Sequence, residues 1–197
     1  MESLVQIDKA TTLWINHLST EWLDPVWKVL SQTEVWFPVY VIIGIFALWK
    51  LGWKRGLAVV LSVVLCVLLV DQGSNLVKYS VARLRPCYDA WMLSNGIRLP
   101  YGTMGSGQYG FFSAHAGNCF GFAVTSFLGM KWNKPDSRFG IYSWCVFTWA
   151  ALVSVSRIMM GAHFLGDILV GALVGLCIGY LCALLARSII RRVETTI

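Results

Sequence analysis

Charged residues are scarce in this chain. Asp, Glu, Lys and Arg together make up 13% of its 197 residues, whereas 57% are hydrophobic. In an ordinary soluble domain about a quarter of the residues carry charge. The shortage excludes a typical water-soluble domain and predicts a chain that lies largely within a lipid bilayer.

Paired cysteine spacings are also missing. None of the six cysteines forms a C-x-x-C pair, and five of them lie in apolar stretches, where we interpret them as small hydrophobic residues. Only Cys87 falls in a polar loop, and it has no evident disulfide partner. The cysteines therefore do not indicate a redox compartment.

The N-terminal segment lacks the features of a cleaved signal peptide. Acidic and basic residues are interspersed among the apolar residues of positions 1–32. The segment therefore has neither a basic n-region nor an unbroken apolar h-region, and we expect it to remain in the mature protein. Leu4–Leu18 and Trp22–Leu30 mix apolar residues with acids and aromatics. This pattern predicts helices that lie along the membrane surface. A partial span for Leu4–Leu18 is the alternative.

Long apolar runs follow, and they predict about five spanning helices. The predicted spans are Val35–Lys50, Gly56–Lys78, Ala114–Met130, Gly140–Ser156 and Asp167–Ser188. We therefore predict an all-α, integral-membrane helical bundle, with six spans if the N-terminal helix also crosses. Residues 1–34 form the interfacial segment and residues 35–197 form the transmembrane bundle, together a single domain.

The distribution of basic residues predicts the orientation. Nine of the 16 Lys and Arg residues fall in short loops and a tail on one side, which should be cytoplasmic by the positive-inside rule. They are Lys50, Lys54, Arg55, Lys131, Lys134, Arg138, Arg187, Arg191 and Arg192. The N-terminal segment and residues 79–113 and 157–166 should then face the periplasm or exterior of a bacterial inner membrane. Because the cations do not form one basic face, the net charge of +6 does not indicate nucleic-acid binding.

Polar residues gather at the helix ends on that outer side. The clusters are Lys78 with Arg85-Pro86, then Ser113-Ala114-His115, then Ser156-Arg157 with His163 and Asp167. The cations Lys78, Arg85 and Arg157 suit a tetrahedral dianion, because guanidinium groups bind phosphate oxygens through paired hydrogen bonds. Ser113 comes just before a predicted helix, whose first N–H groups can also bind phosphate. The clusters predict a phosphate site.

The two histidines of these clusters can have different roles. His163 and Asp167 are four residues apart, which places them on one helix face if the segment is helical there. The carboxylate would then hold one imidazole nitrogen and leave the other free to attack phosphorus. His115 could protonate the departing oxygen and later activate water.

These three clusters resemble the motifs of the type 2 phosphatidic acid phosphatase (PAP2) superfamily. The resemblance rests on Lys78-x6-Arg85-Pro86, Ser113-x-His115 and Ser156-Arg157-x5-His163-x3-Asp167. It implies a phosphohistidine intermediate on His163, oriented by Asp167, with His115 as the acid and base. Lys78, Arg85, Ser113 and Arg157 would hold the phosphate. It also implies catalysis without a metal ion or other cofactor, and inhibition by vanadate.

The chain departs from the family pattern at two positions. Relatives usually have Pro-Ser-Gly-His in the middle motif, where this chain has Phe112-Ser113-Ala114-His115. The alanine adds a methyl group beside the expected phosphate-binding N–H groups. In relatives a proline often stands at the position of Leu165.

The resemblance implies a membrane lipid phosphate as substrate. Undecaprenyl diphosphate and lipid A phosphate are favoured, followed by phosphatidylglycerol phosphate and phosphatidate. A phosphotransferase with the same intermediate is one alternative, and a non-catalytic lipid transporter or scaffold is another. A vanadium haloperoxidase shares similar motifs, but those enzymes are soluble.

Two further patterns lie outside the motifs. Asp71, Asn75 and Lys78 share one face of the second predicted span, which favours a structural hydrogen-bond network over a role in tuning the site. Gly171, Gly175 and Gly179 repeat every fourth residue on the last span. They predict close helix packing within the chain, with a dimer face as the alternative.

Overall fold

A computed structural model describes residues 2–102 and 107–195, and within these ranges the chain is built from helices. The helices are α1 (Glu2–His17), α2 (Asp24–Ser31), α3 (Thr33–Leu51), α4 (Trp53–Val81), α5 (Ala90–Ser94), α6 (Ala114–Asn133), α7 (Gly140–Met159) and α8 (Leu165–Thr195). Single 3-10 turns occur at Glu21–Leu23 and Pro86–Tyr88. The predicted all-α fold is confirmed, and each predicted span corresponds to one long helix.

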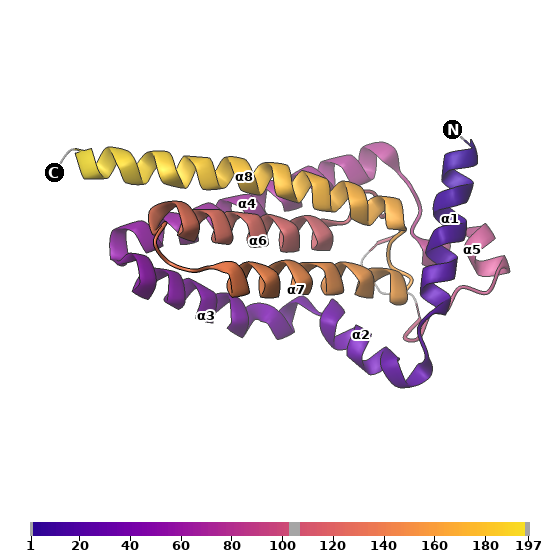
Figure 1. Ribbon diagram of the computed structural model, residues 1–197. Helices are drawn as coiled ribbons and strands as arrows, with labels where there is room; N and C mark the ends of the chain where they lie inside the picture. Colours follow the sequence, from indigo (N-terminus) through magenta and orange to yellow (C-terminus); the bar gives the residue numbers. More distant parts are fainter. Residues whose placement is uncertain (1, 103–106, 196–197) are drawn as a thin grey trace.

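The five long helices run side by side, with α1 across one end of the bundle and α5 beside it (Figure 1). The central helix is α6, which packs most extensively on α8 and also contacts α4 and α7. Successive long helices run in opposite directions, although the connection from α4 to α6 is long and contains α5 (Figure 1). The segments that precede α6 and α8 therefore meet at the end of the bundle where α1 lies.

Among the described residues, four helices are long and apolar enough to cross a membrane: Thr33–Leu51, Trp53–Val81, Gly140–Met159 and Leu165–Arg192. Large apolar side chains also cover the outer surface of the bundle, among them Phe37, Ile42, Leu61, Ile141 and Leu173. An apolar exterior over an apolar core suits hydrocarbon solvent. The chain is thus a multi-pass membrane protein, and the predicted count of five spans, which includes α6, remains a prediction.

One face of α1 carries buried polar residues, and large apolar residues on its other side face outward. Thr12 and Asn16 are fully buried against the bundle, while Ile7 and Trp14 are 60% and 64% exposed. A helix with this division of faces is expected to lie in the membrane interface. Because α1 lies across the end of the bundle, its position fits the predicted interfacial helix better than a partial span, and the interfacial location stays a prediction.

The glycine repeat of α8 packs against α6 within the same chain. A Cβ atom at Gly171 would collide with the Ser113 carbonyl, and one at Gly175 would collide with the Gly117 carbonyl. At Gly179 a Cβ atom would lie 2.7 Å from the Gly121 carbonyl oxygen. The close packing predicted within the chain is therefore present; the alternative of a dimer through these glycines remains untested.

Candidate active site

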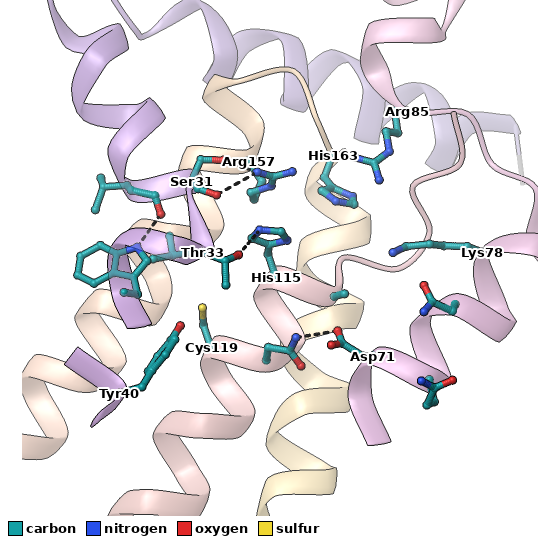
Figure 2. Close-up of a pocket in the computed structure, with 17 residues that line it drawn as sticks. Ser31, Thr33, Tyr40, Asp71, Lys78, Arg85, His115, Cys119, Arg157 and His163 are labelled. Carbon is teal, nitrogen blue, oxygen red and sulfur yellow. Dashed lines mark hydrogen bonds between the residues drawn. The ribbon is translucent and has the colours of Figure 1, made fainter. Parts of the chain in front are cut away.

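A cavity of about 500 Å³ lies where the ends of several helices meet. Five of the predicted site residues line it: Lys78, Arg85, His115, Arg157 and His163. Figure 2 shows both imidazole rings and the Arg157 guanidinium around one space, with the Lys78 and Arg85 side chains reaching toward it. The tertiary structure thus brings together residues that are up to 85 positions apart in the sequence.

Three cations give the cavity its charge. Arg85 and Arg157 are 3% and 4% exposed, and Lys78 lies in the last turn of α4. Arg157 donates to the Ser31 hydroxyl, and Arg85 donates from Nε to the Tyr109 carbonyl at 3.2 Å. Burying cations is costly unless an anion offsets them, and Asp71 is the only carboxylate among the described lining residues. The cavity is therefore suited to an anion.

His163 lies just before α8, not on it, because α8 begins at Leu165. Asp167 occupies the first turn and accepts a hydrogen bond from the Phe164 N–H at 3.0 Å, so its carboxylate turns back toward the start of the helix. This brings Asp167 Oδ2 to 3.5 Å from His163 Nδ1. His163 and Asp167 are therefore close together, as expected. The reason is the hydrogen bond that caps the start of α8, because the two residues do not share a helix face.

The environment of His163 favours its neutral form. Burial lowers the pKa of His163 well below its usual range, and Arg157, Arg85 and Lys78 lower this pKa further. Since only 2% of the residue is exposed, the ring meets the cavity and not bulk water. A neutral imidazole whose Nδ1 faces a carboxylate leaves Nε2 available as a nucleophile.

His115 is held from the other side of the cavity. Its Nε2 lies 3.2 Å from the Thr33 hydroxyl, at the start of α3, and this hydrogen bond is drawn in Figure 2. Ser31, two residues earlier, accepts from Arg157. The short connection between α2 and α3 thus contacts two site residues, which the sequence analysis did not predict.

The remaining motif residues lie behind the cavity or at its edge. Ser113 is fully buried, and its hydroxyl caps α6 by accepting from the Ala116 N–H at 3.4 Å. Ala114 lines the cavity, whereas Pro86 and Ser156 are buried and support the adjoining backbone. The predicted phosphate contact of Ser113 therefore remains a prediction, because its hydroxyl serves the helix cap here.

The polar face of α4 reaches the cavity and links α4 to α6. Asp71 accepts from the Asn118 side chain at 2.8 Å, which supports the structural role predicted for Asp71. Asp71, Asn75 and Asn118 also line the cavity. An effect on turnover through Asp71 or Asn75 is untested.

The sequence analysis missed several residues around the His163–Asp167 pair. Arg83 binds Asp167 at 2.8 Å and Asp8 at 2.6 Å. Gly110 lies so close that a Cβ atom there would be 3.2 Å from Asp167 Oδ2. Arg83 could have been suspected from its place beside Arg85, but no spacing pattern indicated Asp8 or Gly110.

Within residues 2–102 and 107–195, no three or more side chains of His, Cys, Asp or Glu are grouped so that they could hold a metal ion. The polar groups that line the cavity include imidazole, guanidinium, ammonium, amide and hydroxyl groups, with one carboxylate among the described lining residues. These are groups that bind and transfer phosphate.

A cavity lined by cations and imidazoles at one end of an apolar helical bundle is the arrangement expected of a membrane-embedded phosphatase. Sequence comparison defines the family. The model of the PAP2 superfamily matches residues 55–191, and the chain belongs to this superfamily. The expected family is thus confirmed, and the chain is a membrane lipid phosphatase.

Two related proteins match almost the whole chain. A lipid A 4′-phosphatase of Porphyromonas gingivalis is 31% identical over 192 residues, which cover 95% of this chain and 78% of the relative. A lipid A 4′-phosphatase of Bacteroides thetaiotaomicron is 29% identical over 196 residues, which cover 99% of this chain and 84% of the relative.

Two crystal structures share the fold. A transmembrane PAP2 type phosphatidylglycerolphosphate phosphatase from Bacillus subtilis aligns with a TM-score of 0.66 and 20% identity, covering 98% of this chain and 88% of the other. Aquifex aeolicus LpxE aligns with a TM-score of 0.62 and 20% identity, covering 88% of this chain and 92% of the other. At this identity the likeness concerns the fold alone.

Proposed function

We propose that this protein removes the 4′-phosphate of lipid A through a phosphohistidine on His163. The observation that carries the proposal is the single cavity that His115, His163 and three cations line together. The lipid A 4′-phosphatases that match 95% and 99% of this chain support the choice of substrate. Undecaprenyl diphosphate, phosphatidylglycerol phosphate and phosphatidate are the competing substrates.

In the proposed reaction His163 Nε2 attacks phosphorus and the bond from phosphorus to the sugar oxygen breaks. His115 gives a proton to that departing oxygen. Water then attacks phosphorus while His115 takes up a proton from that water. The bond from phosphorus to His163 Nε2 breaks, and inorganic phosphate leaves. Lys78, Arg85 and Arg157 stabilise the charge on the transferring phosphoryl oxygens, and Asp167 orients His163.

The walls of the cavity suit a sugar headgroup. The amide side chains of Gln72, Asn75 and Asn118 line the cavity together with Lys78. Amide groups can donate to and accept from hydroxyl and acylamino groups of a glucosamine. The described structure offers no observation that favours a phosphotransferase or a non-catalytic transporter.

We place the site on the periplasmic face of a bacterial inner membrane. The basic residues counted in the loops lie at the end of the bundle opposite the cavity, where Lys134 donates to the Lys50 carbonyl and Arg55 donates to the Asn133 carbonyl. The positive-inside rule assigns that end to the cytoplasm.

Phosphate release from a panel of lipids tests the proposal. Purified protein in detergent with EDTA is mixed with lipid A, undecaprenyl diphosphate, phosphatidylglycerol phosphate or phosphatidate. We expect the fastest release from lipid A, with mass spectrometry showing loss at the 4′ position and vanadate inhibiting the reaction. His163→Ala should abolish release, because the variant lacks the nucleophile.

Two results would contradict parts of this proposal. Faster release from another lipid would overturn the lipid A assignment and leave the phosphatase intact. Undiminished release by folded His163→Ala would overturn the phosphohistidine mechanism.

A further inference from the structure

A chain of ion pairs runs from α1 to the carboxylate behind His163. Arg83 Nη1 donates to Asp167 Oδ1 at 2.8 Å, and Arg83 Nη2 donates to Asp8 Oδ2 at 2.6 Å. The Arg83 guanidinium also lies 4.1 Å from the centre of the Phe164 ring. Two carboxylates and one aromatic ring therefore define the position of a single arginine.

Asp167 depends on this arginine for its charge and its orientation. The residue is fully buried, and a buried carboxylate is strongly destabilising unless it is paired and hydrogen-bonded. Arg83 occupies Oδ1, whereas Oδ2 accepts from the Phe164 N–H and lies 3.5 Å from His163 Nδ1. Arg83 thus holds one carboxylate oxygen of Asp167 in place, while the other oxygen of Asp167 faces His163.

The same face of α1 holds the segment on both sides of His163. Asp8 Oδ1 accepts from the Gly166 N–H at 2.8 Å, and the Thr12 hydroxyl accepts from the Leu165 N–H at 2.9 Å. These are N–H groups at the start of α8 that lack partners within the helix. A proline at position 165, as in many relatives, would have no N–H for Thr12.

At the other side of this segment, α1 binds the end of α7. Asn16, one turn beyond Thr12, donates to the carbonyls of Ile158 at 2.9 Å and Met159 at 3.2 Å. Thr12 and Asn16 are both fully buried. The polar face of α1 therefore restrains the segment that carries His163 at both of its ends.

We propose that Arg83 and Asp8 are positioning residues for the phosphatase reaction. They hold the Asp167 carboxylate, and through it the His163 ring, in the orientation for attack on phosphorus. The N-terminal helix is thereby a functional part of the active site. This inference rests on the proposed role of His163 as nucleophile.

Positioning through a neighbouring carboxylate has a recognisable kinetic effect. Partners that orient a reactive group from outside it typically change activity by about 10–100-fold when removed. Because neither Arg83 nor Asp8 lines the cavity, the loss should appear in kcat and leave KM nearly unchanged. A residue that binds the substrate would raise KM instead.

The test compares Arg83→Gln, Asp8→Asn and Lys9→Gln, with lipid A and phosphatidate as the substrates. We expect kcat to fall about 10–100-fold in Arg83→Gln and by less in Asp8→Asn, which leaves Arg83 on Asp167. Lys9→Gln is the matched control. Like Asp8, Lys9 lies on α1 and forms an ion pair, at 2.7 Å with Asp89, but this ion pair does not connect to Asp167. This variant should keep the wild-type kcat.

Two further variants separate positioning from folding. Arg83→Lys keeps the charge but cannot reach both carboxylates with a planar fork, so its kcat should lie between those of Arg83→Gln and wild type. Adding Asp8→Asn to Arg83→Gln should lower kcat little further, because Asp8 reaches Asp167 through Arg83, while the asparagine amide oxygen can still accept from the Gly166 N–H. If Arg83→Gln does not fold in detergent, comparing the kcat of Asp8→Asn with that of Lys9→Gln still tests whether the α1 ion pair positions Asp167.

The inference is overturned if wild type is active and Asp8→Asn loses no more kcat than Lys9→Gln. It is also overturned if a folded Arg83→Gln raises KM at unchanged kcat. Absence of phosphate release by wild type from every lipid is a different failure, since it removes the proposed function itself.

Discussion

His163 lies almost entirely out of solvent, yet it borders a cavity with three cations. Burial and those cations keep its ring neutral, which is the form a nucleophile requires. A bound phosphate dianion would offset the cations and favour an imidazolium as charge moves onto the ring. In the proposed mechanism the same cations would thus prepare the empty site and bind the phosphate of the substrate.

Acidification should destabilise the empty enzyme through His163. The unfolded chain takes up a proton on this residue as the pH falls through 6.5, whereas the lowered pKa of His163 keeps the folded ring neutral. The contribution to stability is therefore present above that pH and is lost as the pH falls toward the folded-state pKa. Thermal unfolding in detergent at about pH 7.5 and about pH 5.5 measures the loss.

His163→Gln is the comparison, because glutamine does not titrate. Between about pH 7.5 and about pH 5.5, the unfolding temperature of wild type should fall further than that of this variant. An equal loss in both proteins would contradict the neutral, buried state of His163.

Among the elements, α6 and α8 approach most closely, and glycines make this approach possible. Gly117 and Gly121 of α6 face the carbonyls of Gly171 and Gly175 of α8. Small residues allow two helix backbones to pack closely in a membrane, where apolar burial drives association weakly. This contact also places Ser113 beside α8, where its N–H donates to the Asp167 carbonyl at 3.0 Å.

Gly175→Ala should therefore destabilise the bundle. Its Cβ atom would overlap the Gly117 carbonyl, and such overpacking costs about 1–3 kcal/mol. Gly73→Ala is the control, because no atom lies within 4 Å of a Cβ atom at that position of α4. Unfolding temperatures in detergent should fall for Gly175→Ala and stay level or rise for Gly73→Ala; equal temperatures would contradict the predicted packing.

At the scale of the whole molecule, the cavity and the basic loops counted for the positive-inside rule lie at opposite ends. The cavity and α1 occupy one end, and the C-terminal end of α8 occupies the other (Figure 1). Basic residues in the loops and tail mark this second end, which the positive-inside rule assigns to the cytoplasm.

Reporter fusions at the C-terminus test this orientation. A fluorescent protein fused after residue 197 should fluoresce, since it folds in the cytoplasm, and a periplasmic alkaline phosphatase fused there should be inactive. A fusion after residue 94, in α5, is the control on the opposite side and should give the reverse result. Active alkaline phosphatase at the C-terminus would contradict a periplasmic active site.

The sequence by itself determined the helices and the reacting groups. Apolar runs of sufficient length predicted every long helix, because hydrocarbon solvent requires backbone hydrogen bonds to close within a helix. The predicted bounds lie within three residues of the observed ones, except that α8 runs to Thr195 where the prediction ended at Ser188. Motif spacing likewise predicted Lys78, Arg85, His115, Arg157 and His163 around one cavity. The helices depend on short-range order, which a sequence displays directly, whereas the meeting of these five residues was predicted from the resemblance to the PAP2 motifs.

Only the tertiary structure decided how the reacting groups are held. Thr33, Asp8 and Arg83 contact the site because helix packing brings residues 75 to 84 positions apart into hydrogen-bond distance. The reversal of Asp167 toward His163 likewise depends on where α8 begins, which is decided by the partners that cap its first N–H groups. Such contacts leave no periodic pattern in the sequence, since any donor and acceptor placed there by the fold can make them.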